Sequence, residues 1–212
     1  MKRLLLAALL ACFTLGLSAQ VAIPVTFQGE KPTISDLAWA YVNYESTPAE
    51  GEEEEEECAD ESARAVKSAM TRQRANEALD LGETLSIDLR GGFVLYEWKD
   101  VDSDTRLRIE MCYWNESDGK HKLFACGTYY FDGDQYSAGQ FDGLTFYRYD
   151  NAAKTLTWTD DIGFEVEYGT DDDAWVTYDL PRSGKNITVN YWYGNGTHKQ
   201  KTLQFDGRRF SF

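Results

Sequence analysis

The stretch from Leu107 to Cys126, LRIEMCYWNESDGKHKLFAC, decides the fold class. Between Leu107 and Trp114 apolar residues alternate with polar or mixed ones, and a period of two is the period of a β-strand. Asp118-Gly119 then interrupts the pattern. An Asp-Gly pair between two apolar runs is typical of a hairpin turn, because glycine takes the positive φ that such turns need. The stretch therefore predicts two antiparallel strands joined by a tight turn.

The same alternation predicts a β domain over residues 83–212. Besides this hairpin, strands are expected at residues 85–89, 93–99, 144–149, 155–159, 164–168, 174–180, 186–193 and 201–205. Turn-forming pairs such as Asp132-Gly133 and Asn195-Gly196 separate them. Short strands at this spacing predict a mainly β protein, an antiparallel sandwich or barrel of about ten strands.

One phrase occurs twice within this β domain. Residues 113–122 (YWNESDGKHK) and 191–199 (YWYGNGTHK) share a Tyr-Trp pair followed by Gly-x-His-Lys. Each copy is followed later by Gln-Phe-Asp-Gly, at 140–143 and at 204–207. Because Asp-Gly is a turn signal, we interpret the repetition as two similar β-units of scaffold rather than as a site.

Residues 1–20, MKRLLLAALLACFTLGLSAQ, have the parts of a secretory signal peptide. Lys2 and Arg3 precede an apolar run, and Ala19 ends a small-residue cleavage site. The run is shorter than the roughly twenty residues of a membrane-spanning helix, and no later segment is apolar enough to be one. We therefore expect a secreted protein or one of the periplasm or outer envelope. A lipoprotein attached through Cys12 is the alternative.

Residues 21–82 are predicted to form an N-terminal helical segment. Thr33 and Asp36 resemble a capping box that opens one helix. A narrow apolar stripe predicts a second helix over residues 59–81. Between Glu45 and Glu61 there are ten acids and no base. We interpret residues 45–61 as a solvated acidic linker, with calcium capture or docking onto a basic partner as the alternatives.

The charge of the chain limits its partners. A formal net charge of −15 leads to repulsion from phosphate backbones and anionic membrane surfaces. The sequence therefore predicts no nucleic-acid partner, and, from the lack of a long apolar run, no transmembrane segment. A basic protein is the partner that this charge would attract.

Cys112 and Cys126 are candidates for a disulfide across the predicted hairpin, and the register decides whether they can meet. A two-residue turn at Asp118-Gly119 would point the two side chains to opposite faces of the sheet. A three-residue loop would place them opposite each other. The sequence leaves both alternatives open, and Cys58 would remain unpaired in either.

The sequence offers no recognisable catalytic motif. No nucleophile pattern such as G-x-S-x-G accompanies a histidine. Asp100 begins a segment that resembles a calcium loop, but Thr105 stands where that loop requires glycine. His121 and His198 lie beside lysines near turns, where solvent exposure is expected. We therefore predict no catalytic residue, no metal site and no cofactor.

Three tryptophans share the parity of polar residues in their strands, which makes them candidates for ligand binding. Aromatic rings among hydrogen-bonding side chains suit sugars or peptides, which have apolar faces and polar rims. The alternative is that the helices or a second sheet cover these rings. Trp158 shares the parity of Leu156 and is expected in the core. The predicted ligand-binding residues are Trp114, Trp175, Trp192, Asn190 and Glu110.

The segments EMCYWNESDGKHKLFA, LTFYRYDNAAKTLTW, LPRSGKNITV and QFDGRRF are similar to a group of small secreted proteins of Gram-negative gut-type anaerobes. The resemblance covers roughly residues 93–212. It implies secretion and a β-rich fold and transfers no catalytic residue. The glutamate-rich stretch departs from the pattern of the group.

These observations predict a secreted or envelope protein that acts as a non-catalytic binding or structural module. Its ligand would be a glycan or peptide held by aromatic side chains. One alternative is an acidic inhibitor or interaction protein that docks on a basic protein partner. A carboxylate-based hydrolase is the remaining alternative.

Overall fold

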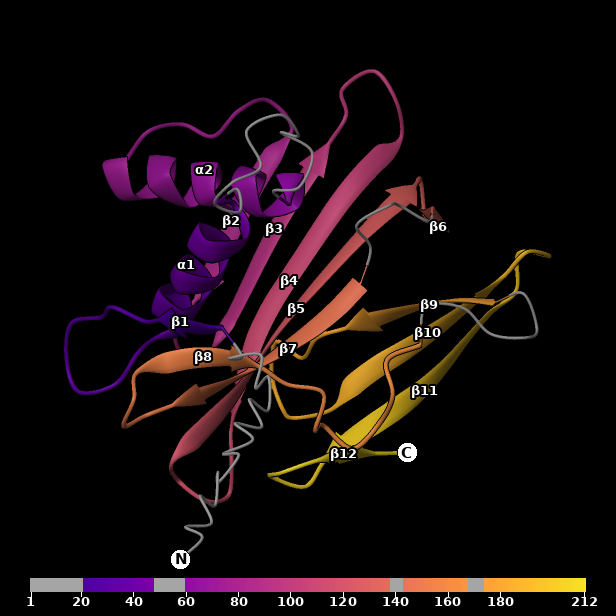
Figure 1. The fold of residues 1–212 in the computed structure, drawn as a ribbon. Coiled ribbons are helices and arrows are strands. Elements are labelled where there is room, and N and C mark those ends of the chain that lie inside the picture. The colour runs from indigo at the N-terminus through magenta and orange to yellow at the C-terminus, as the bar shows by residue number, and fades with distance from the viewer. Residues whose placement is uncertain (1–20, 48–59, 138–142, 168–173) are drawn as a thin grey trace, which may run out of the picture.

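The computed structural model describes residues 21–47, 60–137, 143–167 and 174–212. The predicted signal peptide and most of the predicted acidic linker lie outside these residues. Within them the chain is mainly β, with two antiparallel sheets and two helices near the N-terminus (Figure 1). The predicted fold class is thus confirmed, and its two-sheet form is the one found.

The larger sheet has eight strands: β1 (Ala22–Pro24), β2 (Glu83–Asp88), β3 (Phe93–Lys99), β4 (Thr105–Asn115), β5 (His121–Asp132), β6 (Gln135–Ser137), β7 (Gly143–Asp150) and β8 (Thr155–Trp158). Their order is β1-β8-β7-β5-β4-β3-β2, with β6 paired to β5. Because β1 and β2 lie at opposite edges, the described part of this sheet does not close into a barrel.

The smaller sheet has four strands in the order β12-β11-β10-β9. They are β9 (Ala174–Asp179), β10 (Ile187–Tyr193), β11 (His198–Phe205) and β12 (Phe210–Ser211). We call the two sheets the large sheet and the small sheet.

The helices are α1 (Ile34–Glu45) and α2 (Glu61–Ala75). The predicted capping box is present at α1: the Thr33 N–H donates to Asp36 Oδ2 at 2.8 Å, and Thr33 Oγ1 accepts from the Asp36 N–H at 3.4 Å. The second helix is shorter than predicted. Asn76 takes a left-handed conformation with φ 57° and caps α2. A residue in this conformation ends a helix, and asparagine tolerates it better than most residues.

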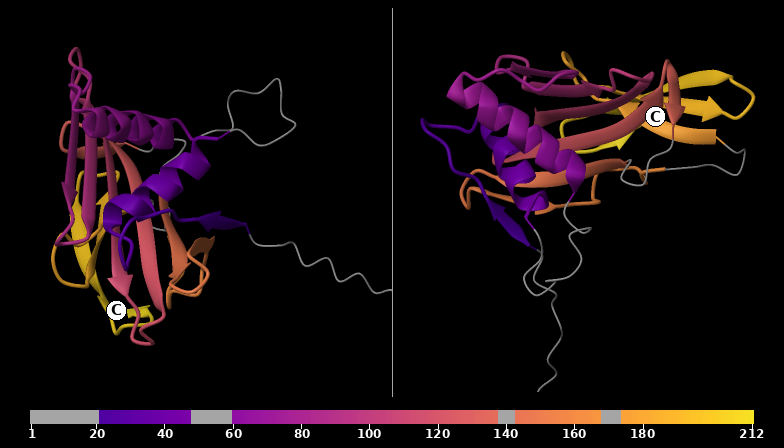
Figure 2. Two further views of the ribbon diagram at one scale, coloured as in Figure 1. Left: turned by 90° about the vertical axis from the view of Figure 1, so that its left-hand side faces the viewer. Right: turned by 90° about the horizontal axis from the view of Figure 1, so that it is seen from above.

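The elements form three layers. The helices lie on one face of the large sheet and the small sheet lies on the other (Figure 2). Alternating side chains of β4 point to opposite faces of the large sheet. Ile109 and Met111 pack in a core with α1 and α2, whereas Cys112 and Trp114 pack in a second core with the small sheet. The large sheet is therefore buried on both faces in its central strands.

The register of the β4–β5 hairpin decides between the two alternatives for Cys112 and Cys126, and it excludes a disulfide between them. Met111 pairs with Cys126, and Cys112 pairs with Ala125, which is the register of the two-residue turn. Cys112 then lies in the core beneath the small sheet and Cys126 in the core beneath the helices. Both are buried free thiols. Burial raises the pKa of Cys126 to about 12 and that of Cys112 well above its ordinary value.

Both copies of the repeated phrase form hairpins, β4–β5 and β10–β11. In the second copy, Asp206-Gly207 makes the turn from β11 to β12, with Gly207 at φ 103°. The Gly207 carbonyl accepts a hydrogen bond from the Ser117 N–H at 2.7 Å, which ties this turn to the first hairpin. The second copy therefore forms the β-unit that the sequence predicts. Residues 140–142 of the first lie outside the described residues.

Two local predictions are wrong. The expected strand at residues 164–168 is irregular chain over residues 164–167. Trp158 is not in the core, since 47% of its surface is exposed. β8 ends at this residue, and the parity of a strand no longer dictates burial at its end.

No helix among the described residues has the length and apolar character needed to cross a membrane.

Candidate functional site

Trp175 and Trp192 lie side by side on one face of the small sheet. They are directly paired across β9 and β10. Trp175 is 50% exposed, and Trp192 is partly buried. We call the face that carries them the tryptophan face. Its aromatic surface extends to the large sheet, because Tyr136 of β6 lies 6.4 Å from Trp175 and Phe131 of β5 lies 6.3 Å from Trp192 between ring centroids.

Neighbouring side chains fix the orientation of Trp192. The His198 imidazole stacks on its ring at 4.1 Å between centroids and an interplanar angle of 6°. Its Nε1–H donates to Thr177 Oγ1 at 2.9 Å. His198 pairs with Trp192 across β10 and β11, so the antiparallel register creates this stack. Trp192 is therefore held rigidly, and Trp175 presents its exposed surface beside it.

Asn190 is the buried hydrogen-bonding centre of the tryptophan face. Its Nδ2 donates to Asp179 Oδ2 at 3.0 Å. Its Oδ1 accepts from Gln200 Nε2 at 2.8 Å and lies 3.1 Å from His198 Nε2. Asn190 is buried, and these partners satisfy its polar atoms, which would otherwise destabilise the fold.

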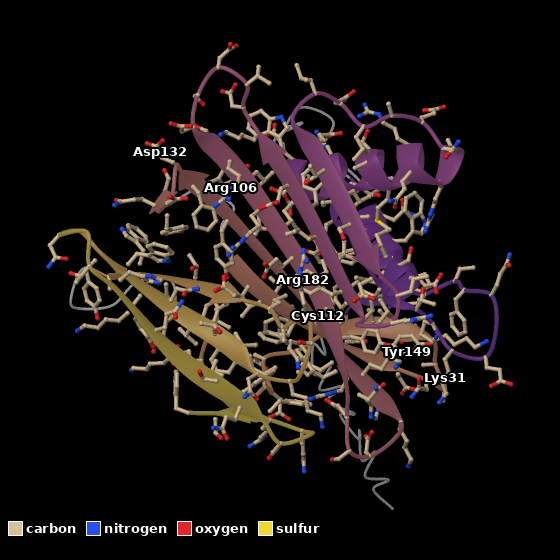
Figure 3. All side chains as sticks on the ribbon, turned by 180° about the vertical axis from the view of Figure 1, so that it is seen from behind. Lys31, Arg106, Cys112, Asp132, Tyr149 and Arg182 are labelled. Atoms are coloured by element: carbon tan, nitrogen blue, oxygen red, sulfur yellow. The ribbon has the colours of Figure 1, made fainter. Side chains whose placement is uncertain are left out.

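Arginine and carboxylate side chains join the tryptophan face to the large sheet. Arg108 Nη2 donates to Asp179 Oδ1 at 2.6 Å, and Arg108 Nε lies 3.8 Å from Glu110 Oε1. The guanidinium carbons of Arg106 and Arg108 each lie 4.9 Å from the Phe131 ring centroid. Figure 3 shows Arg106 on the large sheet, on the face that is turned toward the small sheet. The site therefore contains positive charge within an acidic protein.

Glu110 is the less exposed carboxylate of this cluster, with 12% of its side chain exposed. Its Oε2 accepts the Leu180 N–H at 2.8 Å. Burial raises the pKa of Glu110, and nearby Asp179 adds to the increase, while Arg108 and the Leu180 N–H oppose it. The side chain links the end of β9 to the middle of β4.

The structure brings together four of the five predicted ligand-binding residues. Trp175 and Trp192 are adjacent. Asn190 contacts both Asp179 and His198. Glu110 is connected to them through Arg108, which contacts both Glu110 and Asp179. The parity rule also predicts Asp179 and Thr177 on the same face as Trp175. The contact between Arg108 and Asp179 joins two strands far apart in sequence, and no local pattern predicts it.

Trp114 does not belong to this site, and its prediction as a ligand-binding residue is wrong. It is 3% exposed and packs against Phe146, Phe205 and Phe210. Its Nε1–H donates to the Lys185 carbonyl at 2.9 Å. The parity rule placed Trp114 on the face of Arg108 correctly. That face, however, is covered by the small sheet at this end of β4.

Side chains that could bind a metal lie together at another place in the fold. Among the described residues, Glu116, Asp118 and His121 form a group whose ligand atoms all lie within 4.8 Å of one another. They occupy the turn between β4 and β5, on the opposite end of β4 from Arg106. The prediction for His121 rested on the lysines beside it and not on these acids, so the group was missed.

Comparisons with known proteins identify no relative. No family model, no curated protein and no solved structure matches the chain, so the resemblance seen in the sequence stays a prediction.

Proposed function

We propose that this is a non-catalytic binding protein that holds a glycan on Trp175 and Trp192. The observation that carries the proposal is the pairing of a half-exposed tryptophan with a rigidly held one on a face rich in hydrogen-bonding groups. The C–H bonds on the face of a sugar ring pack favourably against the electron-rich face of an indole. A peptide is the alternative ligand.

Polar side chains beside the two rings support this ligand class. Gln200 and His198 are exposed and share Asn190 as a hydrogen-bond partner, and Asp179 is partly exposed. Sugar hydroxyls both donate and accept hydrogen bonds, so they suit amide, imidazole and carboxylate groups together. Rigid rings also lose little conformational entropy on binding, which favours affinity.

The test is calorimetric titration of the protein with a panel of cell-wall and plant polysaccharides at low and high salt. We expect saturable binding that Trp175→Ala removes. Trp158→Ala is the matched control, because Trp158 of β8 is similarly exposed away from the tryptophan face. Equal loss with both variants, or full binding by Trp175→Ala, would contradict the proposal. If the chain bound no polysaccharide but bound basic proteins at low salt only, the acidic interaction protein would be favoured instead.

A second candidate function is a carboxylate-based hydrolase. The observation that favours it is the raised pKa of Glu110 beside Asp179, since two carboxyl groups in different environments can act as acid and base. Against it, both carboxylates contact Arg108, and Glu110 already accepts the Leu180 N–H. Release of reducing sugars by the wild-type chain, lost in Glu110→Gln, would replace the binding proposal with this one.

A further inference from the structure

The turn between β4 and β5 brings one histidine and two carboxylate side chains together. His121 Nδ1 lies 2.6 Å from Asp118 Oδ2 and 3.9 Å from Glu116 Oε2. The group lines a pocket of about 440 Å³ to which Arg148, Asp161 and Arg208 also contribute. One imidazole nitrogen and two carboxylate oxygens thus converge beside a space that can admit further ligands.

Glu116 is oriented by a residue from another strand. Its Oε1 accepts a hydrogen bond from Arg148 Nε of β7 at 2.9 Å. The side chain is almost fully buried, at 7% exposure, and the remaining Oε2 is the oxygen nearest to His121. An arginine that engages one carboxylate oxygen leaves the other free and fixed in direction, which is how hydrogen-bonded neighbours orient carboxylate ligands in metal sites.

The imidazole of His121 is flanked on its other side as well. Its Nε2 lies 3.7 Å from Asp150 Oδ2 at the end of β7. In metal sites the ring nitrogen that does not bind the metal usually faces a carboxylate, which fixes the tautomer and makes the histidine a better ligand. Nδ1 is therefore the nitrogen that would bind a metal, and the metal would take the place of the proton that Nδ1 shares with Asp118 Oδ2 in a 2.6 Å hydrogen bond.

The spacing suits a small transition-metal ion. Ligand atoms held about 2.1 Å from a tetrahedral Zn²⁺ lie about 3.4 Å apart. The distance of 3.9 Å between His121 Nδ1 and Glu116 Oε2 is close to this value. The 2.6 Å hydrogen bond between Nδ1 and Asp118 Oδ2 is shorter and would lengthen when a metal replaces its proton. A Ca²⁺ ion takes six to eight oxygen ligands and does not favour imidazole nitrogen. A mixed nitrogen and oxygen set instead favours Zn²⁺ and its neighbours in the first transition row.

The second hairpin of the chain provides an internal comparison. His198 occupies the corresponding place after Trp192, but Gly194 and Asn195 stand in that loop and no carboxylate precedes the histidine. His198 instead stacks on Trp192. The acids around His121 are thus a property of the first hairpin and not of the repeated scaffold.

We propose that Glu116, Asp118 and His121 form a binding site for a divalent transition-metal cation, with Zn²⁺ as the preferred ion. Water or an anion that reaches the pocket completes the coordination. Arg148 and Asp150 are positioning residues, because each contacts a ligand residue on the side away from the metal.

The experiment follows the two histidine rings by NMR while tag-free protein is titrated with zinc chloride. The chain has two histidines, so the spectrum is simple, and His198→Ala assigns it. We expect the ring signals of His121 to shift with saturation at one equivalent and those of His198 to stay in place. Calcium chloride at the same concentrations should leave both rings unchanged.

Conservative variants separate ligation from folding. Asp118→Asn keeps an oxygen for the N–H groups of Lys120 and His121, and Glu116→Gln keeps an acceptor for Arg148. We expect each to abolish the His121 shift while the His198 signals show an intact fold. Asp150→Asn should weaken zinc binding by about 10- to 100-fold without abolishing it.

Two outcomes would overturn the proposal. One is a zinc titration in which the His121 signals do not move. The other is unchanged zinc affinity in Glu116→Gln or His121→Ala, which would assign the binding to acids elsewhere in the chain. Neither outcome bears on the glycan proposal, whose residues lie on the small sheet.

Discussion

At the scale of the residue, two tryptophans of similar sequence context have opposite environments. Trp114 is packed among three phenylalanine rings between the sheets, whereas half of Trp175 faces solvent. Both follow the alternation of their strands. What separates them is their cover: the small sheet lies over Trp114 near the end of β4, whereas Trp175, near the start of β9, is left half exposed.

Trp114→Ala should therefore lower the free energy of unfolding by about 3–5 kcal/mol, because it opens a large cavity and leaves the Lys185 carbonyl without its donor. Trp175→Ala should change it by less than about 1 kcal/mol, because much of this side chain is exposed already. Urea unfolding followed by circular dichroism measures both. Similar losses for the two variants would show that Trp175 is buried in solution.

Glu110 should make the stability of the protein depend on pH. Because burial raises its pKa in the folded state, its contribution is fully present below the unfolded pKa and is lost as pH rises through the folded pKa. Glu110→Gln cannot ionise and keeps an acceptor for the Leu180 N–H. We expect the variant to gain stability relative to the wild type between pH 4 and pH 7, by about 1.4 kcal/mol for each unit of pKa shift.

Urea unfolding of both chains at several pH values measures this difference. Comparison with the variant cancels the other titrating groups, including Glu45, whose pKa is also raised. A difference that stays constant with pH would mean that Glu110 has an ordinary pKa. A variant that loses stability as pH rises would mean that the ion pair with Arg108 dominates.

At the scale of the element, local sequence signals predict starts and turns better than ends. The capping box at Thr33 marks the start of α1, and Asp118-Gly119 marks the first hairpin. The end of α2 was missed because Asn76, which precedes the expected stop at Gly82, takes the left-handed conformation and caps the helix. Irregular chain at residues 164–167 was missed because its alternating pattern also packs well without strand pairing: Phe164 and Val166 contact the core between the sheets.

The cap of α1 can be tested by itself. Thr33→Ala removes the side chain that accepts the Asp36 N–H, and it should lower the free energy of unfolding by about 1 kcal/mol. Thr33→Ser keeps a hydroxyl and should restore most of this loss. The measurement is the urea midpoint of the three chains at equal slope. If alanine were as stable as serine, the capping box would make no net contribution.

At the scale of the whole molecule, the three-layer arrangement was not predictable from the sequence. Alternation showed a β-rich chain and the parity of each strand, but parity does not say which faces will be covered. The environments of Trp114, Cys112 and Cys126 all depend on which faces of the large sheet are covered. Helices cover one face of the large sheet and the small sheet covers the other, so residues of both parities are buried (Figure 2). The arginine contacts of the candidate site likewise depend on how the sheets meet.

The two buried thiols report on these layers. In a chain with Cys12→Ser and Cys58→Ser, we expect neither Cys112 nor Cys126 to react with a thiol reagent in the native state, because both are buried and their pKa values are raised. After unfolding in guanidinium, both should react. Rapid reaction of one thiol in the native protein would show that its covering layer opens. No free thiol after unfolding would show a disulfide.

The pairing of β1 with β8 has a consequence for the order in which the protein folds. Ile23 lies opposite Leu156, so β1, the first strand among the described residues, must find a partner that is synthesised after almost all of the large sheet. The hairpins from β2 to β5 join neighbouring segments and close short loops, which is fast, whereas the contact of β1 closes a very long one. The earliest strand to be made is therefore among the latest to be placed, and the edge of the sheet at β8 stays open to other strands until it arrives.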